Sequence, residues 1–179
     1  TITCTGKFDL VEKDNPINCW IYSVADGWGS HGPETLETAI RDSCNFYFNT
    51  VGYYLGQNEN GEYVGDMTLL NKYAEMYGFD STSGIEISEM DPQIATADPT
   101  RAAMGQSNNA FTTSQLARYV TTLANSGTCY DLTLLDKITD ASGNTQEEPD
   151  PVVHNRLELP QDLWTTIHAG MHDVTINNG

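Results

Sequence analysis

The chain has little positive charge, and this excludes a class of ligands. Its 179 residues include 8 Lys and Arg against 25 Asp and Glu, for a formal net charge of −17. A nucleic-acid surface needs clustered basic side chains to neutralise phosphates, so no nucleic-acid partner is expected. The acidity suits a soluble protein in an open or salty environment, but it names no partner.

Long apolar runs are also missing from the sequence. No stretch approaches the roughly 20 apolar residues of a membrane helix, and the N-terminus TITCTGKFDL has neither region of a signal peptide. Hydrophobic residues nevertheless make up 39 % of the chain, enough for one domain with a core. The chain starts at Thr1 without a methionine and ends on the turn-like TINNG, so we expect a piece of a longer protein.

Cysteine is too scarce for a disulfide scaffold. Cys4, Cys19 and Cys44 nevertheless fall early in the chain, with His31 between the last two. Three thiolates and one imidazole complete a tetrahedral zinc shell, and a metal would stabilise residues 1–32, which contain little apolar material. The alternative is a disulfide between Cys4 and Cys19, with Cys44 as an inert buried thiol. The spacing alone leaves both interpretations open.

Apolar residues at helical spacing are the main secondary-structure signal. Cap and stop residues support each predicted helix. Residues 80–100 are expected to form an extended loop, and a β-hairpin is expected with its turn at Ser142 to Asn144. Four helices are predicted. The first starts at Pro33 and ends at the Ser43-Cys44-Asn45 trio, and the second runs from Asp66 to a stop at Gly78. The third runs from about Ser114 to Asn125, and the fourth starts at Pro160.

The trio Ser43-Cys44-Asn45 has two interpretations. It is either a plain helix end, where the Ser and Asn side chains satisfy backbone groups, or part of a catalytic centre. A hydroxyl such as that of Ser43 can pass a proton between a base and a leaving amine. A carboxamide such as that of Asn45 can hydrogen-bond a substrate amide in acyl transfer.

Three segments, in one order, resemble the penicillin-binding transpeptidases. HGPETLETAIRDSCNFYF resembles the stretch around that family's S-x-N motif. MGQSNNAFTTSQLARYVTTLANSG resembles its G-Q dipeptide, T-P-x-Q-[LM]-A helix and A-N-x-G stop, although Thr113 replaces the usual Pro and Ser107 a frequent Gly. WTTIHAGMHDV resembles its W-x-x-[IV]-x-x-G-M-x-x-V segment. The family's S-x-x-K and K-[ST]-G motifs do not occur in the sequence, so the chain resembles the part between them in a class B, elongation-type member.

The resemblance implies an α+β, predominantly helical fold: the helical lobe of the penicillin-binding transpeptidase and serine β-lactamase-like fold, with a small β-hairpin. The chain then forms one partial transpeptidase domain. Its expected parts are a loop-rich segment 1–32 with the candidate metal site, a helical lobe 33–127, a β-hairpin region 128–159 and a short helix region 160–179 that leads towards the family's sheet.

The resemblance also implies a parent enzyme that cross-links peptidoglycan stem peptides by serine acyl transfer and is acylated by β-lactams. It assigns catalytic roles to Ser43 and Asn45, and it implies a structural zinc beside S-x-N, held by His31 and Cys44 and completed by Cys4 and Cys19. No cofactor is implied for catalysis. Residues 1–179 alone are expected to be inactive, because they lack the nucleophile.

The implied parent is anchored by an N-terminal segment at the extracytoplasmic side of the bacterial membrane, with a glycan polymerase as membrane partner. Two alternatives remain: a β-lactamase or β-lactam-sensor relative, and a secreted zinc-stabilised interaction module without catalysis. Cys129 is expected to be a buried thiol. His154, His168 and His172 are expected to be surface or core residues, because no cysteine lies near them in the sequence.

Overall fold

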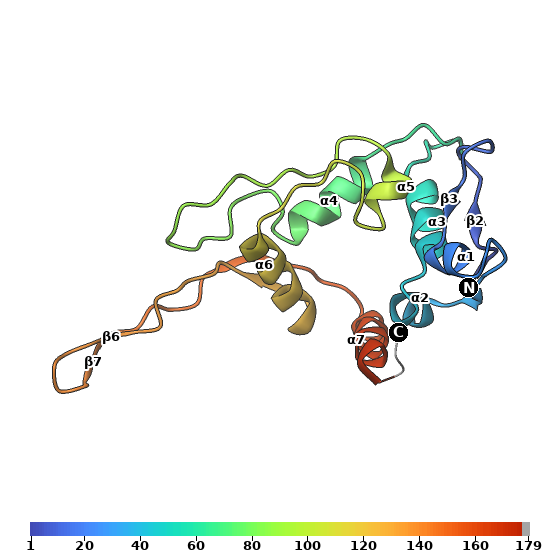
Figure 1. Ribbon diagram of the computed structural model, residues 1–179. Helices are drawn as coiled ribbons and strands as arrows, with labels where there is room; N and C mark the ends of the chain where they lie inside the picture. Colours follow the sequence, from blue (N-terminus) through green and yellow to red (C-terminus); the bar gives the residue numbers. More distant parts are fainter. Residues whose placement is uncertain (177–179) are drawn as a thin grey trace. The chain divides into compact units, whose positions relative to one another are not determined.

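A computed structural model describes residues 1–176 (Figure 1). Residues 177–179, the end of the predicted segment 160–179, lie outside the described residues. The fold is α+β and predominantly helical, as the sequence predicts. The helices are α1 Trp20–Val24, α2 Leu36–Arg41, α3 Asn45–Leu55, α4 Thr68–Met76, α5 Pro99–Ala102, α6 Thr113–Ala124 and α7 Gln161–Ile176.

The strands are short and form antiparallel pairs. Across residues 1–176 no sheet has more than two strands: β1 pairs with β4, β2 with β3, β5 with β8, and β6 with β7. None of the described helices is long and apolar enough to span a membrane. The strands are β1 Ile2–Cys4, β2 Lys7–Phe8, β3 Ile17–Asn18, β4 Gly32–Glu34, β5 Thr128–Tyr130, β6 Ile138–Thr139, β7 Thr145–Glu147 and β8 Val153–Arg156.

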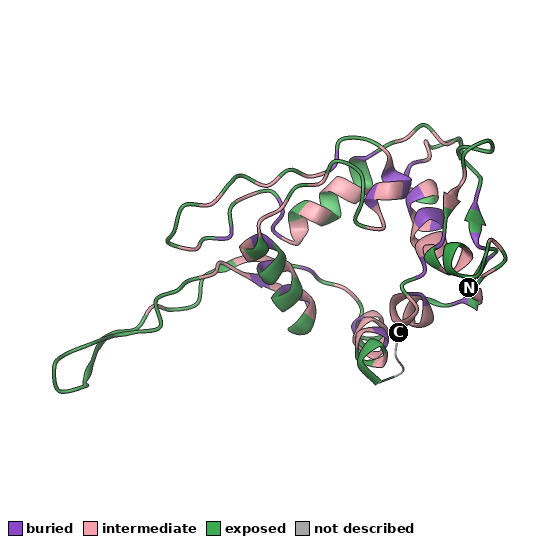
Figure 2. Cartoon of the chain, viewed as in Figure 1, coloured by how far each residue is buried: buried purple, intermediate pink, exposed green. Residues whose placement is uncertain are grey.

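The chain divides into two compact units. Unit 1 comprises residues 1–71, 95–109 and 159–179, and unit 2 comprises residues 72–94 and 110–158. Unit 1 contains the helix pairs α2 with α7 and α3 with α5. Unit 2 is built around α6 and the pair of strands β5 and β8. Buried segments occur in both units, whereas the β6–β7 hairpin is exposed throughout (Figure 2).

Glycines let the helices of unit 1 approach closely. A Cβ atom on Gly52 of α3 would lie 2.2 Å from the Pro99 carbonyl oxygen of α5. A Cβ on Gly170 of α7 would lie 2.8 Å from the carbonyl oxygen of Glu37 in α2. These distances are too short for any side chain. Gly170 therefore belongs to the W-x-x-I-x-x-G-M segment for a packing reason, because it allows α7 to lie against α2.

The first predicted helix is α2, which ends at the Ser43-Cys44-Asn45 trio as predicted, and a second helix, α3, follows it directly. The predicted start at Pro33 is wrong, because Pro33 pairs with Thr3 in the β4–β1 ladder. Thr35 instead caps α2 through a reciprocal capping box with Thr38. The aromatic residues after Asn45 are not behind a helix end but inside a second helix, α3. Ser43 adopts the left-handed backbone conformation, with a φ of 50°, and this residue separates α2 from α3.

The other helices lie near their predicted positions. Asp66 accepts a hydrogen bond from the Thr68 backbone N–H at 2.9 Å and so begins α4, and Gly78 ends it at φ 83°. The sequence did not predict the short helices α1 and α5. The final helix α7, predicted to be short, has 16 residues. The predicted hairpin is confirmed as β6 and β7, with the turn between them held by Asp140.

Unit 2 is organised around the side chain of Arg118, which is fully buried on α6. Its guanidinium donates to the carbonyl oxygens of Gly78, Ser81 and Thr82. It also lies 3.4 Å from the Asp131 carboxylate. One buried cation thus holds the loop after α4 against α6, because carbonyl oxygens left without a donor in the interior are costly.

The start of α6 is held by hydrogen bonds from polar side chains. Thr112 caps the helix, and Gln115 closes the capping box through its side chain. The Gln115 carboxamide also donates to the Met90 carbonyl oxygen at 2.8 Å. The Glu89 carboxylate accepts from the hydroxyls of Thr112 and Ser114. The T-x-x-Q pattern formed by Thr112 and Gln115 therefore serves to cap the start of α6.

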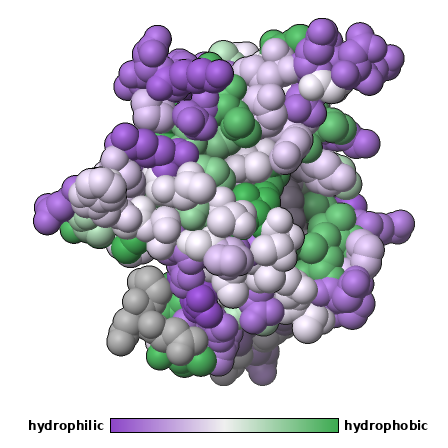
Figure 3. Space-filling model, turned by 90° about the vertical axis from the view of Figure 1, so that its right-hand side faces the viewer, coloured by the Kyte–Doolittle hydropathy of each residue, from purple (hydrophilic) through white to green (hydrophobic). Residues whose placement is uncertain are grey.

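Large apolar side chains are also exposed in places. The face drawn in Figure 3 carries apolar patches among hydrophilic side chains. In unit 1, Trp28 is 90 % exposed and Val24 is 68 % exposed. Many soluble proteins expose scattered apolar side chains, so exposure alone assigns no function here.

Candidate functional site

The S-x-N segment joins α2 to α3 through a tight, fully hydrogen-bonded turn. The Ser43 N–H donates to the Ile40 carbonyl at 3.2 Å, and the Cys44 N–H donates to the Ala39 carbonyl at 2.9 Å. This pair of bonds is the Schellman motif that commonly ends a helix. Cys44 is at once the residue that completes this motif and the N-cap of α3. Asn45 is therefore the first residue of the second helix.

Ser43 occupies the left-handed position of the motif, where glycine is usual. Its φ is 50°, and a residue with a Cβ atom pays roughly 1–2 kcal/mol for that conformation. Ser126 has the same role at the end of α6, with φ 62° and the same two bonds to Leu123 and Thr122. The left-handed serine is thus not by itself evidence of catalysis.

The side chains of the trio point to different environments. Ser43 is exposed, Asn45 is half-buried, and Cys44 is fully buried. Within residues 1–176 the side chains of Ser43 and Asn45 make no hydrogen bond, so both polar groups are available to a ligand. The adjacent Asp42 carboxylate is held by Arg41 through bonds of 2.6 and 2.8 Å. Those hydrogen bonds lower the pKa of Asp42.

The predicted metal ligands come together in unit 1. One donor atom from each of Cys4, Cys19, His31 and Cys44 lies within 4.8 Å of the others. Cys4 ends β1, opposite Gly32 and so beside His31. Cys19 is the N-cap of α1. Four separate pieces of backbone therefore meet at these side chains.

The spacing of the donor atoms fits a tetrahedral ion. Cys19 Sγ and His31 Nδ1 are 3.5 Å apart, and two such donors on one zinc would be roughly 3.6 Å apart given ordinary Zn–S and Zn–N bond lengths. All four cysteines of the chain are free thiols, so the structure contains no Cys4–Cys19 bond. His31 Nε2 is buried without a hydrogen-bond partner among the described residues.

The close thiols shift one another's pKa values. A hydrogen bond from the Cys44 thiol lowers the pKa of Cys19 to about 4. The same bond raises the pKa of Cys44, whereas burial raises the pKa of Cys4. Cys129 belongs to unit 2 and is buried as predicted, with its Sγ 3.7 Å from the Tyr77 carbonyl oxygen.

Sequence reasoning missed Trp20, which contacts both features. Its indole Nε1 donates to the Asp42 carbonyl oxygen at 2.9 Å. Its ring centroid lies 5.4 Å from that of His31. The one signal in the sequence is its position, directly after Cys19.

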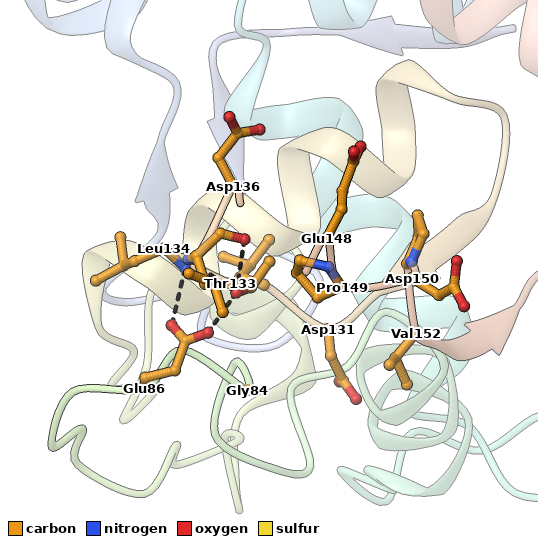
Figure 4. A pocket seen from close by; sticks show the side chains of 13 residues that line it. Gly84, Glu86, Asp131, Thr133, Leu134, Asp136, Glu148, Pro149, Asp150 and Val152 are labelled. Atoms are coloured by element: carbon orange, nitrogen blue, oxygen red, sulfur yellow. Dashed lines mark hydrogen bonds between the residues drawn. The ribbon is translucent and has the colours of Figure 1, made fainter. Parts of the chain in front are cut away.

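Unit 2 contains a cavity of about 580 Å³, and none of the candidate site residues above lines it. Figure 4 shows Leu134 and Thr133 on one side, Pro149 and Asp150 on the other. The Glu86 carboxylate accepts from the Leu134 N–H at 2.8 Å and from the Thr133 hydroxyl. Its lining is made of backbone loops and exposed carboxylates, and no catalytic candidate from the sequence lies in it.

The family model described as the penicillin binding protein transpeptidase domain matches residues 8–179. The chain belongs to this family. Penicillin-binding protein 2B of Streptococcus pneumoniae is 25 % identical over an alignment of 190 residues. The alignment covers 96 % of this chain and 27 % of that protein. The chain therefore spans about a quarter of the length of this curated relative.

Solved structures of similar proteins share the fold. A structure of penicillin-binding protein 2B from Streptococcus pneumoniae strain 5204 gives a TM-score of 0.71 at 24 % identity, over 92 % of this chain and 29 % of that one. A structure titled as a peptidoglycan synthase complex that coordinates polymerization and crosslinking also gives 0.71, at 19 % identity, over 97 % of this chain and 28 % of that one. The helical-lobe fold predicted from the sequence is confirmed.

Proposed function

We propose that this chain is part of a peptidoglycan D,D-transpeptidase, an enzyme that cross-links stem peptides by serine acyl transfer. The observation that carries the proposal is the turn at Ser43. It presents an exposed hydroxyl beside the carboxamide of Asn45, both free of hydrogen bonds within residues 1–176, in a chain of the transpeptidase family. A hydroxyl and a carboxamide side by side are the groups that acyl transfer at an amide bond can use for proton transfer and substrate binding.

The proposed reaction is two successive acyl transfers. A serine hydroxyl attacks the carbonyl carbon of a D-Ala-D-Ala bond, the C–N bond breaks, and D-alanine leaves with a proton on its amine. The amine of a neighbouring stem peptide, or water, then attacks the ester and releases the serine. The nucleophile and its lysine base belong to an S-x-x-K motif, which the 179 residues do not contain. Residues 1–179 alone should therefore form no covalent adduct with penicillin.

This chain supplies a proton path and a substrate contact. The Ser43 hydroxyl would carry the proton from the lysine base to the leaving amine, because a hydroxyl both donates and accepts. The Asn45 side chain, held at the first position of α3, would hydrogen-bond the substrate amide and keep the scissile bond in register. Both groups are placed by backbone that is itself hydrogen-bonded.

The test compares two serines with the same backbone conformation. In the full-length protein that contains this chain, Ser43→Ala should slow acylation by a fluorescent penicillin about 100-fold or more. A side chain that transfers a proton in the transition state usually contributes at least this factor to the rate. Ser126→Ala is the matched control, because Ser126 has the same left-handed geometry, and its variant should react at the parental rate. Equal acylation rates for Ser43→Ala and Ser126→Ala would contradict the proposed role of Ser43.

We also propose that Cys4, Cys19, His31 and Cys44 hold a structural zinc ion. The support is the donor set, three thiols and an imidazole within 4.8 Å of one another, and the match of the 3.5 Å Cys19–His31 separation to a tetrahedral site. A bound zinc would tie residues 1–32 to the S-x-N turn through Cys44. The four protein donors leave no open position, so the ion would have no catalytic role.

The partners and location proposed for the whole protein rest on its family. β-Lactams and peptidoglycan stem peptides would react with the missing serine, and a glycan polymerase would be the membrane partner. The similar structure titled as a complex that coordinates polymerization and crosslinking supports this partner. The parent would be anchored in the bacterial membrane with this domain on the extracytoplasmic side.

A further inference from the structure

The end of α2 is supported by a side chain from another element. In a Schellman motif the final carbonyl groups of the helix are only partly satisfied from within. The carbonyl oxygen of Asp42, the C-cap residue, accepts the indole N–H of Trp20 at 2.9 Å. At the equivalent turn after α6, no side chain donates to the Asn125 carbonyl among the hydrogen bonds of residues 1–176. The two otherwise similar turns differ in this contact.

The contact fixes the peptide unit between Asp42 and Ser43. A peptide is planar, so its carbonyl and N–H turn together. Here the carbonyl oxygen accepts from Trp20, and the N–H of the same unit donates to Ile40 at 3.2 Å. A flip of this unit would break both bonds and move Ser43 out of its conformation at φ 50°. Trp20 therefore supplies one of the two hydrogen bonds that hold this peptide unit, and with it the backbone that carries the Ser43 side chain, in place.

Trp20 is itself firmly placed. Its backbone follows Cys19, whose N–H donates to the Gly6 carbonyl at 2.8 Å. Its ring lies 5.4 Å from the His31 ring, with the planes tilted by 58°. The indole is 41 % exposed, so it is not a core residue kept only for its volume.

We infer that Trp20 is a positioning residue for Ser43, which keeps the hydroxyl in the geometry that acyl transfer needs. The inference rests on the proposed function. Trp20 need not touch the substrate, because its indole N–H acts through the Asp42 carbonyl. A loss of this bond lets the 42–43 peptide sample other orientations, and a displacement of about 1 Å at a reacting group can cost on the order of 100-fold in rate.

The experiment uses Trp20→Phe in the full-length protein, which keeps an aromatic ring beside His31 and removes the N–H. The rate of acylation by a fluorescent penicillin should fall about 10- to 100-fold. The matched control is Trp28→Phe, because Trp28 is 90 % exposed, and its rate should equal that of the parent. Zinc content and Tm should be the same in both variants.

A double variant separates positioning from a general structural effect. If Trp20 acts through the Ser43 hydroxyl, Trp20→Phe should have little further effect in a Ser43→Ala background. A full additional loss there, a parental rate for Trp20→Phe, or a loss of zinc or Tm that parallels the rate would each overturn the inference. A parental rate for Ser43→Ala would instead overturn the proposed function, and the role of Trp20 with it.

Discussion

Two turns of the molecule share one backbone geometry and differ in their surroundings. After α2 and after α6, a serine adopts the left-handed conformation, with φ of 50° at Ser43 and 62° at Ser126. Each serine and the residue that follows it close the same pair of bonds onto the preceding helix. Ser43 leads through the buried Cys44 into another helix, whereas Ser126 leads through Gly127 into β5. The comparison shows that tertiary support, and not local strain, distinguishes the candidate catalytic serine.

Metal removal should have the largest effect, and it should affect the turn at Ser43 but not the turn at Ser126. Chelation should unfold residues 1–32 and release the turn at Ser43, because structural zinc contributes about 10 kcal/mol in zinc-finger peptides. Hydrogen-exchange mass spectrometry on the full-length protein should then show peptides 1–32 and 42–45 exchanging much faster, and peptide 122–127 unchanged. Unchanged exchange in the first two, with a disulfide seen by mass spectrometry, would favour the disulfide interpretation.

Substitution of Arg118 should instead destabilise α6, the helix that precedes the turn at Ser126. Arg118→Met removes the donor from three carbonyl oxygens and takes from Asp131 one of its two partners, the other being His154. We expect a loss of about 3–5 kcal/mol in the free energy of unfolding of unit 2, because each of the three carbonyl oxygens left without a donor costs roughly 1–3 kcal/mol. Arg156→Met, at an exposed arginine, is the control and should change Tm little. Hydrogen exchange should localise the Arg118 effect to residues 77–82 and α6, with residues 42–45 unaffected.

Acid should weaken the start of α6 more than the turn at Ser43. Burial raises the pKa of Glu89, but hydrogen bonds from Ser114, Thr112 and Ser83 outweigh it and lower the pKa to about 2. The folded-state pKa lies below the ordinary carboxyl value of 4.5, so this stabilisation is present above that pH and is lost as the pH falls towards 2.

Glu89→Gln should remove much of this acid dependence. Urea unfolding followed from pH 5 to pH 2 measures it, with Glu75→Gln as the control, because Glu75 is an exposed carboxylate whose side chain makes no hydrogen bond within residues 1–176. A pH profile for Glu89→Gln that matches the parent would contradict the assignment.

Glycine at the two serines should have the smallest effect on stability and should sharpen the comparison. Ser43→Gly and Ser126→Gly each relieve the left-handed conformation, with an expected gain of roughly 0.5–1 kcal/mol after the backbone entropy of glycine is counted. Thermal unfolding should give similar shifts for both variants. Only Ser43→Gly should lose acylation activity. A destabilised Ser43→Gly would indicate that its hydroxyl has a structural partner.

The sequence predicted most of what depends on local residue chemistry. The cap at Thr112, the stop at Gly78 and the hairpin turn beside Asp140 all follow from backbone preferences of single residues. The four candidate ligands were found because thiol and imidazole form a recognisable donor set, and the structure brings them together. Their metal, and the catalytic roles of Ser43 and Asn45, stay predictions.

What the sequence did not predict depends on contacts between distant segments. The sequence predicted the helix end at the Ser43-Cys44-Asn45 trio but not the second helix that begins at Asn45, because periodicity does not show how the chain turns after a helix end. The bond from Trp20 to Asp42 spans 22 residues, and that of Arg118 to Gly78 spans 40. Such pairings depend on how the chain folds back, which spacing in one sequence does not record.

Cys44 has three roles, and together they limit how this segment can change in evolution or by engineering. One residue completes the end of α2, begins α3 and belongs to the thiol cluster. An insertion or deletion of a single residue here would break the pair of hydrogen bonds that ends α2, and would take either the N-cap of α3 or the thiol out of its place. Substitutions can accumulate around this junction, but its length is fixed. Grafts between relatives should therefore be joined outside residues 35–55.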